Sequence, residues 1–430
     1  MENIIYVCLL IVYCGVFVLI TIGIVGKTNA GKTTLFNAAT LLNAKISNLP
    51  FTTKKPNIGN AFVCDFCVCK ELGVKDNPLN SSCIDGWRYV PVKIIDVPGL
   101  IKDAWQGRGL GNQFLNTIAA ADALIHVVDA SGSIDAEGQI TKPGMGNPVQ
   151  DAIDIEFELH RWLAEIILNN KSLILREITS GKSVAEAITK PLAGVKANVT
   201  AVAKALEISD LKTKALNNWE LDEAMRFAKS LLPLIKPTLI VANKMDILNS
   251  ERYLNLLREH FGRGFVAACS AEAELVLRRA EKKGLLHYTP GEEKFKISST
   301  AELSPQQKGA LEYVETRVMD RWMRTGIQQA LNTLVLKLLR MNMVYPVADE
   351  SKFSDNHGNV LPDVYLMPVN STPMDLARSV HTTLLKNYLL AIDAQTGVRL
   401  PSDYILRHKD VIKIVTHPGA KTKPKTKPKI

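Results

Sequence analysis

Short apolar runs bounded by glycine, proline or polar residues recur along the chain and predict buried β-strands. They lie at residues 21–25, 89–95, 238–242 and 264–268. A continuous apolar run of this length, rich in β-branched residues, is typical of a parallel strand that is covered on both faces. We therefore expect an α/β fold with a mostly parallel sheet and helices on both faces.

Two longer stretches lack this pattern and place apolar residues at helical spacing instead. In residues 151–232 strand signals largely vanish, and Trp162 and Ile166 belong to a periodic apolar stripe. Because this stretch interrupts the series of strands, we expect an inserted helical arm that is antiparallel and resembles a coiled coil. Residues 274–345 are also predicted to be mostly helical, with Pro346 as the residue that breaks the helix.

The last part of the chain changes character again. Residues 361–417 combine short strands, turn residues and one amphipathic helix, which indicates a small separate domain. After it, lysine alternates with threonine and proline, the composition of a basic tail that either binds phosphate backbones or only aids solubility. The expected division is an apolar extension (1–20), an α/β domain in two parts (21–150 and 233–345), the helical arm (151–232), a C-terminal domain (346–417) and the tail (418–430).

Directly after the first predicted strand, the chain carries the pattern G-x-x-x-x-G-K-[ST] of a phosphate-binding loop. Glycine leaves room for backbone N–H groups to curl around phosphate oxygens. Lys32 supplies positive charge to the β- and γ-phosphates, and the Thr33 hydroxyl can ligate Mg²⁺. The predicted nucleotide-binding residues of this segment are Gly26, Lys27, Thr28, Asn29, Ala30, Gly31, Lys32, Thr33 and Thr34.

Two further segments are predicted to contact Mg²⁺ and the γ-phosphate. Asp96 ends the second strand and can hold Mg²⁺ through water, while Gly99 leaves its N–H group free for the γ-phosphate. Thr52 and Thr53 lie in a proline-bounded loop, where a threonine can ligate Mg²⁺ and sense the γ-phosphate, whose loss then releases the loop. We expect Lys32, Thr53 and Gly99 to be catalytic, and Thr33, Thr52, Thr53 and Asp96 to form the Mg²⁺ site.

Two segments later in the chain predict how the base is recognised. Asn243, Lys244 and Asp246 follow the third strand. The Asp246 carboxylate can accept hydrogen bonds from N1–H and the N2 amino group of guanine, whereas adenine lacks this donor pair. Adenine would leave the carboxylate unpaired, at a cost of roughly 1–3 kcal/mol, so guanine is preferred. Ser270 and Ala271, after the fourth strand, are expected to place backbone N–H groups near the guanine O6.

Several of these motifs resemble those of the Obg superfamily of GTPases. Residues 51–59 (FTTKKPNIG) resemble its first switch, and residues 96–100 (DVPGL) with residues 107–114 (GRGLGNQF) resemble its second. The closest resemblance is to the YchF-like branch in its archaeal form. Residues 367–377 (MPVNSTPMDLA) resemble the TGS domain, a small β-grasp domain of proteins that act with RNA or ribosomes.

The resemblance implies a cytoplasmic, Mg²⁺-dependent GTPase that hydrolyses GTP to GDP and phosphate and acts as a switch on ribosomes or RNA. YchF proteins often carry a glutamate in place of Asp246 and accept ATP, so the aspartate here favours GTP. Leu100 stands where Ras-like enzymes place a water-orienting glutamine, which implies slow intrinsic turnover. Asn29 lies where some GTPases coordinate K⁺, with an asparagine that caps its own turn as the alternative. A nucleotide sensor with negligible turnover, a membrane-anchored GTPase and an ATP-using enzyme are the rival hypotheses.

Charge and the N-terminus bear on the partner. The chain has 430 residues and a formal net charge of +9, which suits an anionic partner such as RNA. Residues 4–20 are uncharged and just long enough for a membrane-spanning helix, but the first predicted strand follows at Thr21 without a linker. We expect translation to begin near Leu19, with a membrane anchor as the alternative.

The cysteines predict a second metal site. Cys64, Cys67, Cys69 and Cys83 lie between the two switch segments. Four thiolates at such spacing could bind Zn²⁺ tetrahedrally, and reduced, partly buried thiols on a hairpin are the alternative. Disulfides are not expected in a cytosolic nucleotide switch.

Overall fold

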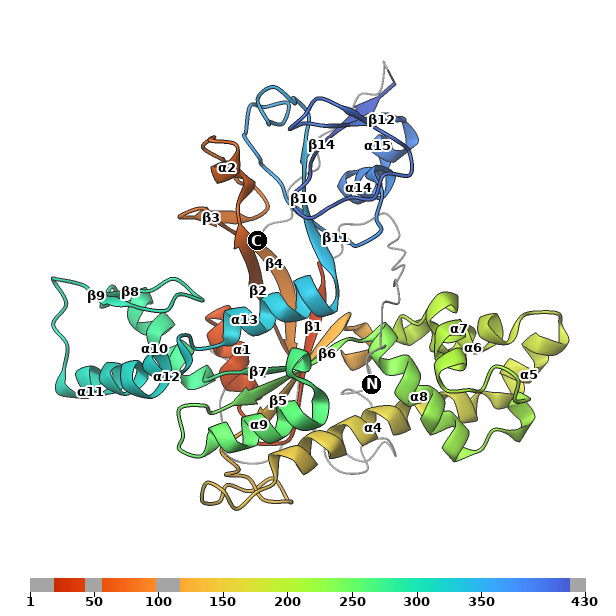
Figure 1. Cartoon of the computed structure of the whole chain (residues 1–430), viewed down its shortest axis with the longest axis horizontal. Helices are drawn as coiled ribbons and strands as arrows, with labels where there is room; N and C mark the ends of the chain where they lie inside the picture. The colour runs from red at the N-terminus through yellow and green to blue at the C-terminus, as the bar shows by residue number, and fades with distance from the viewer. Residues whose placement is uncertain (1–18, 43–55, 98–116, 418–430) are drawn as a thin grey trace. The chain divides into compact units, whose positions relative to one another are not determined.

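The computed structural model describes residues 19–42, 56–97 and 117–417 (Figure 1). The chain forms two compact units. The larger unit consists of Ile20–Phe62 and Val92–Leu338, and the smaller unit contains Val63–Pro91 and the chain from Leu339 onward.

Residues 1–18 of the predicted N-terminal extension and the whole basic tail lie outside the residues that the structure describes. Within the described ranges, no helix combines the length and the apolar character that crossing a lipid bilayer requires.

A mostly parallel sheet is the centre of the larger unit, which confirms the predicted α/β class. Its strands are β1 (Thr21–Val25), β2 (Asn57–Phe66), β3 (Ser82–Ile84), β4 (Trp87–Asp96), β5 (Ala123–Asp129), β6 (Thr238–Asn243) and β7 (Val266–Ala268). Their order is β2-β4-β1-β5-β6-β7, with β3 paired to β4. Strand β1 is parallel to both β4 and β5, and β5, β6 and β7 continue the parallel series. Every residue of β1 and β5 is buried, because helices cover both faces of the sheet.

The register of the sheet gathers polar side chains at one edge. Ile24 of β1 lies opposite Asp96, the last residue of β4. Asp129, the last residue of β5, lies opposite Asn243, the last residue of β6. Since these strands are parallel, their carboxyl ends lie at the same edge of the sheet, and the loops that leave them lie next to one another.

Helices pack against the sheet through apolar faces. Helices α1 (Lys32–Thr40), α9 (Ser250–Phe261) and α13 (Ile327–Asn332) and the π-helix η6 (Thr333–Leu338) contact these strands, and α10 (Ala271–Lys282) packs against α1. Val128 and Ile240 pack with Leu254 and Leu257 of α9. The alternate residues of β5 and β6 point to the opposite face, and η6 contacts both strands.

The stretch predicted as an arm contains helices α4 (Pro148–Asn169), α5 (Lys171–Thr179), α6 (Val184–Leu192), α7 (Val199–Ile208) and α8 (Leu221–Ile235). These helices form a bundle (Figure 1). Trp162 of α4 and Phe227 of α8 are buried in its apolar core, which continues into the sheet through Val25, Ile95 and Leu124. Lys236, directly after α8, is buried and donates hydrogen bonds to the carbonyls of Ala119 and Ala121 at 2.9 and 2.6 Å. The bundle is therefore tied to the chain that enters β5.

The remaining elements of the larger unit are short strands and helices after α10. They are β8 (Leu286–His287), β9 (Lys296–Ile297), α11 (Pro305–Val314), the π-helix η5 (Glu315–Met319) and α12 (Asp320–Trp322), with single 3-10 turns at Ala193–Val195, Leu216–Asn218 and Arg263–Phe265. Apolar residues of α10 and α11 form a separate small core with Tyr288.

The smaller unit holds a five-stranded mixed sheet. Its elements are β10 (Met341–Val347), β11 (Tyr365–Pro368), α14 (Pro373–Val380), α15 (Thr382–Lys386), β12 (Tyr388–Asp393), β13 (Arg399–Leu400) and β14 (Val411–Thr416). The strand order is β11-β10-β14-β12-β13, with β10 and β14 parallel. Helix α14 begins with a capping box of Thr372 and Asp375. Pro346 lies inside β10, so its prediction as a helix breaker is wrong.

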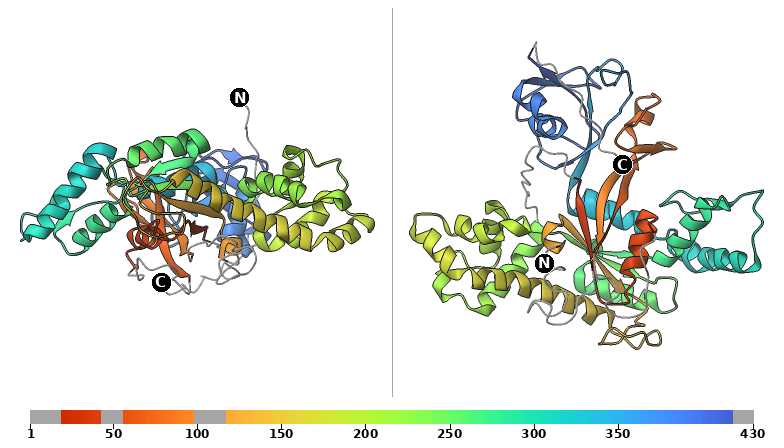
Figure 2. Two further views of the ribbon diagram at one scale, coloured as in Figure 1. Left: turned by 90° about the horizontal axis from the view of Figure 1, so that it is seen from below. Right: turned by 180° about the vertical axis from the view of Figure 1, so that it is seen from behind.

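The smaller unit also includes residues 63–91, which contain the end of β2 and the start of β4. This excursion comprises the end of β2, helix α2 (Val68–Glu71), a loop and the β3–β4 hairpin, and it lies beside the C-terminal sheet (Figure 2). Backbone N–H groups of Asn77 and Leu79 donate to the carbonyls of Val360 and Pro362 at 2.8 and 2.7 Å. The sequence did not predict this association.

Candidate nucleotide site

The loop between β1 and α1 needs glycine at both ends. Gly26 and Gly31 have φ values of 143° and 98°, which L side chains rarely adopt. A Cβ atom on Gly26 would lie 2.3 Å from the Val127 carbonyl oxygen, and one on Gly31 would lie 2.2 Å from Asn243 Nδ2. The two glycines therefore let the loop lie directly against the carboxyl ends of β5 and β6.

Lys32 begins helix α1 beneath this loop. Its side chain is buried, and its ammonium group donates a 2.8 Å hydrogen bond to the Lys27 carbonyl. Burial lowers the pKa of Lys32 to about 8, against the opposing effect of the nearby Asp96 carboxylate. Phosphate oxygens would supply the negative charge that this buried ammonium requires, and the N-terminus of α1 favours the same ligand.

The other loop positions lie around this lysine. Lys27 forms a 2.6 Å ion pair with Asp151 of α4, and Asn29 adopts a left-handed conformation with φ 65°. The Asn29 side-chain amide donates to the Gly138 carbonyl at 2.9 Å. Thr28 and Ala30 complete the loop, and Thr34 follows Thr33 in the first turn of α1.

Asp96 and Thr33 form the candidate metal centre. The Thr33 hydroxyl donates to Asp96 Oδ2 at 2.7 Å, and Asn57 Nδ2 donates to the same oxygen at 3.2 Å. Burial raises the pKa of Asp96, while the Thr33 hydrogen bond and the Lys32 charge oppose that shift. Asp96 Oδ1 is buried and has no hydrogen-bond partner within the described ranges. The Thr33 hydroxyl and the Asp96 carboxylate, whose Oδ1 has no partner within the described ranges, therefore form a set of oxygen ligands that suits Mg²⁺.

Asn243 connects the phosphate loop to the base-binding segments. Its Nδ2 donates to the Ala30 carbonyl at 2.9 Å, and its Oδ1 accepts from the Ala271 N–H group at 3.0 Å. Asp246, three residues later, accepts a 2.7 Å hydrogen bond from the Ser270 hydroxyl on Oδ1. Three segments that are far apart in sequence are thus held in one network.

Lys244 has a partner that sequence reasoning missed. Its ammonium group lies 2.9 Å from Asp129 Oδ2 and 3.2 Å from the Ser133 hydroxyl. The buried Asp129 carboxylate also accepts hydrogen bonds from Ser131 Oγ at 2.6 Å and Ser133 Oγ at 2.7 Å. The sequence feature that could have indicated this pairing is the polar segment that begins with Asp129, at the end of an apolar strand.

Tyr313 of α11 is a second missed residue. Its hydroxyl donates to the Asp246 carbonyl at 3.2 Å and lies 3.5 Å from Asp246 Oδ2. Nothing in the local sequence around this partly exposed tyrosine marks it as part of the site.

Not every predicted residue can be placed. Thr52, Thr53 and Gly99, the predicted switch contacts, lie outside the described residues, as does Leu100. Their roles stay predictions.

The structure brings together only part of the predicted cysteine site. Cys67, Cys69 and Cys83 group with Asp76, whereas Cys64 of β2 is not among these ligand atoms. None of the five described cysteines, these four and Cys269, forms a disulfide.

Three family models match the chain. A model described as a 50S ribosome-binding GTPase matches residues 21–175. A model described as the "Obg-like GTPase YGR210-like, G4 motif-containing domain" matches residues 241–349, and the TGS domain model matches residues 357–416.

Known proteins are similar over most of the chain. A GTP-binding protein of Methanocaldococcus jannaschii is 42% identical over 395 residues, which is 92% of this chain and 98% of that protein. The crystal structure of a GTP-binding protein from Pyrococcus horikoshii superposes with a TM-score of 0.74 at 36% identity and covers 93% of this chain and all of that one (100%). The ribosome-binding ATPase YchF of Mycoplasma genitalium is 33% identical over 54% of this chain and 58% of its own length.

Proposed function

The chain belongs to the Obg-like, YchF-like family of GTP-binding proteins with a TGS domain, and from this premise we propose that it is a Mg²⁺-dependent GTPase that acts as a switch on ribosomes or RNA. One observation carries the proposal. Asn243 links the Ala30 carbonyl of the phosphate loop to the N–H group of Ala271, beside the Ser270 hydroxyl that orients Asp246. A nucleotide that reaches from Lys32 to Asp246 would lie along this network.

The base is proposed to be guanine. Asp246 is half-buried, and Ser270 holds one of its oxygens. An aspartate in this setting accepts hydrogen bonds from N1–H and N2–H₂ of guanine, and adenine would leave it unsatisfied at a cost of about 1–3 kcal/mol. The YchF relative is named an ATPase, and a comparison of GTP with ATP tests which base this chain prefers.

The residues present fit a magnesium ion at the phosphate end. Thr33 and Asp96 would hold it, with Thr52 or Thr53 as the proposed further ligand. When bound, Mg²⁺ neutralises charge on the β- and γ-phosphates and helps to orient them. Lys32 places its ammonium group against the same oxygens, and the Gly99 N–H group is proposed to complete the γ-phosphate contacts.

Potassium is proposed as an accessory ion beside Asn29. This residue holds a left-handed turn, and its amide bonds to Gly138, so its side chain is already oriented by the loop. A cation here would supply the positive charge that an arginine finger gives in other GTPases, a contribution of up to about 10³–10⁵ in rate.

The partner is proposed to be a ribosome or an RNA. The net charge of +9 and the TGS domain support an anionic macromolecule, and one matching family model is described as ribosome-binding. Leu100 in place of a water-orienting residue supports a switch that turns over slowly until a partner completes the site. A nucleotide sensor with negligible turnover is the second candidate on the same observation.

Single-turnover phosphate release tests the proposal. GTP and ATP are compared with and without Mg²⁺, with K⁺ or Na⁺, and with or without ribosomes, and Lys32→Ala serves as the inactive control. We expect release from GTP that requires Mg²⁺ and accelerates with K⁺ and ribosomes. Binding that does not distinguish GTP from ATP, or that is unchanged without divalent cation, would contradict the proposal. GTP binding without release under every condition would favour the sensor.

A further inference from the structure

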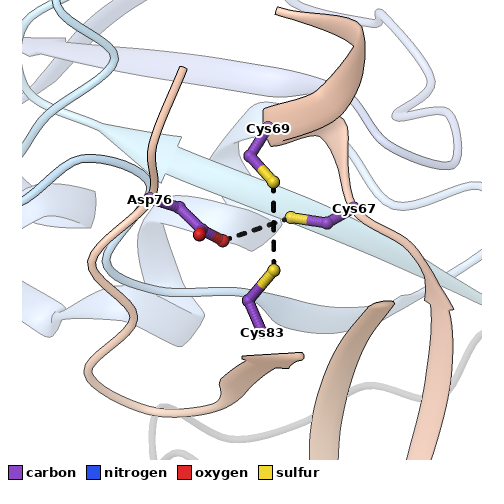
Figure 3. A group of neighbouring side chains, drawn as sticks. All are labelled: Cys67, Cys69, Asp76 and Cys83. Atoms are coloured by element: carbon purple, nitrogen blue, oxygen red, sulfur yellow. Dashed lines mark hydrogen bonds between the residues drawn. The ribbon is translucent and has the colours of Figure 1, made fainter. Parts of the chain in front are cut away.

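A compact group of ligand side chains lies in the smaller unit, in the excursion of residues 63–91 (Figure 3). Cys67 precedes helix α2, Cys69 lies within it, Asp76 is in the following loop and Cys83 is in β3. The three Sγ atoms and one carboxylate oxygen all lie within 4.8 Å of one another. Cys67 and Cys69 are buried, and Cys83 is half-buried.

Two of the distances between these ligand atoms match opposite edges of a zinc coordination tetrahedron. Zn–S bonds of about 2.3 Å in a tetrahedral site place two sulfur atoms about 3.8 Å apart. The Sγ atoms of Cys69 and Cys83 are 3.9 Å apart, and Cys67 Sγ is 3.4 Å from Asp76 Oδ2. In Figure 3 these two contacts cross, as opposite edges of a tetrahedron do.

We propose that Cys67, Cys69, Asp76 and Cys83 bind one structural zinc ion. Three thiolates and a carboxylate are ligands that Zn²⁺ accepts, and four protein ligands close the site to water, which is typical of structural zinc. The carboxylate stands where the sequence predicted Cys64. This proposal does not depend on the nucleotide site.

Arg88 supplies the support that a metal ligand usually needs. Its side chain is wholly buried, Nη1 donates to Asp76 Oδ2 at 2.8 Å, and Nη2 donates to the Leu361 carbonyl at 2.5 Å. Such a partner fixes the orientation of a ligating carboxylate. Three thiolates and one carboxylate carry more negative charge than Zn²⁺ neutralises, and the buried guanidinium of Arg88 offsets part of the excess.

The ion would fix a segment that has little regular structure of its own. No helix or strand lies between α2 and β3, yet Asn77 and Leu79 in that interval bond to the backbone at Val360 and Pro362. A cross-link from Cys67 to Cys83 holds both ends of this loop. Zinc would therefore order the edge that the excursion presents to the C-terminal sheet within the smaller unit.

A disulfide between Cys69 and Cys83 is the competing chemistry. It requires an S–S distance of about 2.0 Å, far shorter than the observed 3.9 Å. It would also leave Cys67 and Asp76 without a role, whereas zinc uses all four side chains.

Metal content of the full chain, purified without chelators or metal-affinity steps, tests the proposal. We expect about one zinc per chain, retained in Cys64→Ser and lost in Cys83→Ser. Cys64 is the matched control, because it is a buried cysteine of the same excursion outside the ligand group. GTP affinity should be the same in both variants, so a failure here is distinct from a failure of the proposed GTPase.

X-ray absorption and cobalt substitution of the wild-type chain keep the test decisive even if Cys83→Ser does not fold. We expect three sulfur neighbours and one oxygen neighbour around the metal, and thiolate-to-cobalt charge-transfer bands after exchange with Co²⁺. Four sulfur neighbours, loss of zinc in Cys64→Ser, a metal-free protein, or a mass two hydrogens lower from a Cys69–Cys83 disulfide would each overturn the assignment.

Discussion

The substitution Asp246→Asn tests how the base is recognised while it changes the site as little as a substitution can. Asparagine keeps the shape of the side chain and an oxygen that can accept the 2.7 Å hydrogen bond from Ser270. The substitution replaces the second carboxylate oxygen, which accepts hydrogen bonds, with an amino group that donates them. Guanine presents two donors, N1–H and N2–H₂, so one of its two hydrogen bonds is lost and becomes a contact between two donors.

The expected loss follows from the charge of the group. A hydrogen bond to a charged partner contributes about 1.5–3 kcal/mol. Its removal should weaken GTP binding about 10- to 150-fold, since each 1.4 kcal/mol is about a factor of ten. Xanthine carries a carbonyl where guanine has its amino group, so it offers one donor and one acceptor. The asparagine matches that pair, and XTP should therefore bind the variant more tightly than it binds the wild type.

Fluorescent-nucleotide displacement at fixed Mg²⁺, with GTP, XTP and ATP as competitors, measures all of these affinities. The gain for XTP is an internal control, because a misfolded variant would lose affinity for every nucleotide. Unchanged GTP affinity, or equal losses for GTP and XTP, would refute the role of Asp246 as the group that reads the base.

Three further predictions concern the same unit. Burial lowers the pKa of Lys32 to about 8, and phosphates favour its charged form. Nucleotide binding should therefore take up close to one proton at pH 9 and little at pH 7, so the affinity falls as the pH rises through 8. Calorimetry in buffers of different ionisation enthalpy measures this uptake, and its absence at pH 9 would contradict the prediction. Gly31→Ala should lower the free energy of unfolding by about 2 kcal/mol or more, because its Cβ would lie 2.2 Å from a side-chain amide at a φ of 98°. In the control Gly309→Ala, where no atom lies within 4 Å of the new Cβ, urea unfolding should show no loss of stability. Lys244→Met should leave the buried Asp129 carboxylate without its cation and cost about 1–3 kcal/mol, and a midpoint of thermal unfolding equal to that of the wild type would argue against this pairing.

The features predicted correctly from sequence are those that the local chain determines. The first predicted strand, residues 21–25, is β1, and the phosphate loop follows it because its glycines alone allow φ values of 143° and 98°. A continuous apolar run is also sufficient to predict a buried parallel strand, whichever helices cover it.

Pro346 shows where a local rule is incomplete. A proline lacks a backbone donor and is predicted to end a helix, yet Pro346 pairs opposite Ile412 in the parallel ladder of β10 and β14. The pairing of β10 with β11 runs only from Met341 to Val344, so Pro346 lies beyond it and needs no donor on that side. Strand position, which the sequence pattern did not reveal, decides whether proline is tolerated.

The partners that were missed come from distant parts of the chain. Lys244 and Asp129 are separated by 115 positions, and Arg88 and Leu361 by 273. The spacing of the cysteines alone favoured Cys64 as a zinc ligand. Cys64 is a residue of strand β2, however, and the carboxylate that lies among the other three thiols belongs to Asp76 in a loop. Arg88 donates a hydrogen bond to the same carboxylate, and a second hydrogen bond ties Arg88 to Leu361 of the C-terminal domain. Motif spacing therefore identifies which chemistry a segment can perform, whereas the choice among neighbouring ligands is made by contacts that form only when distant segments pack together.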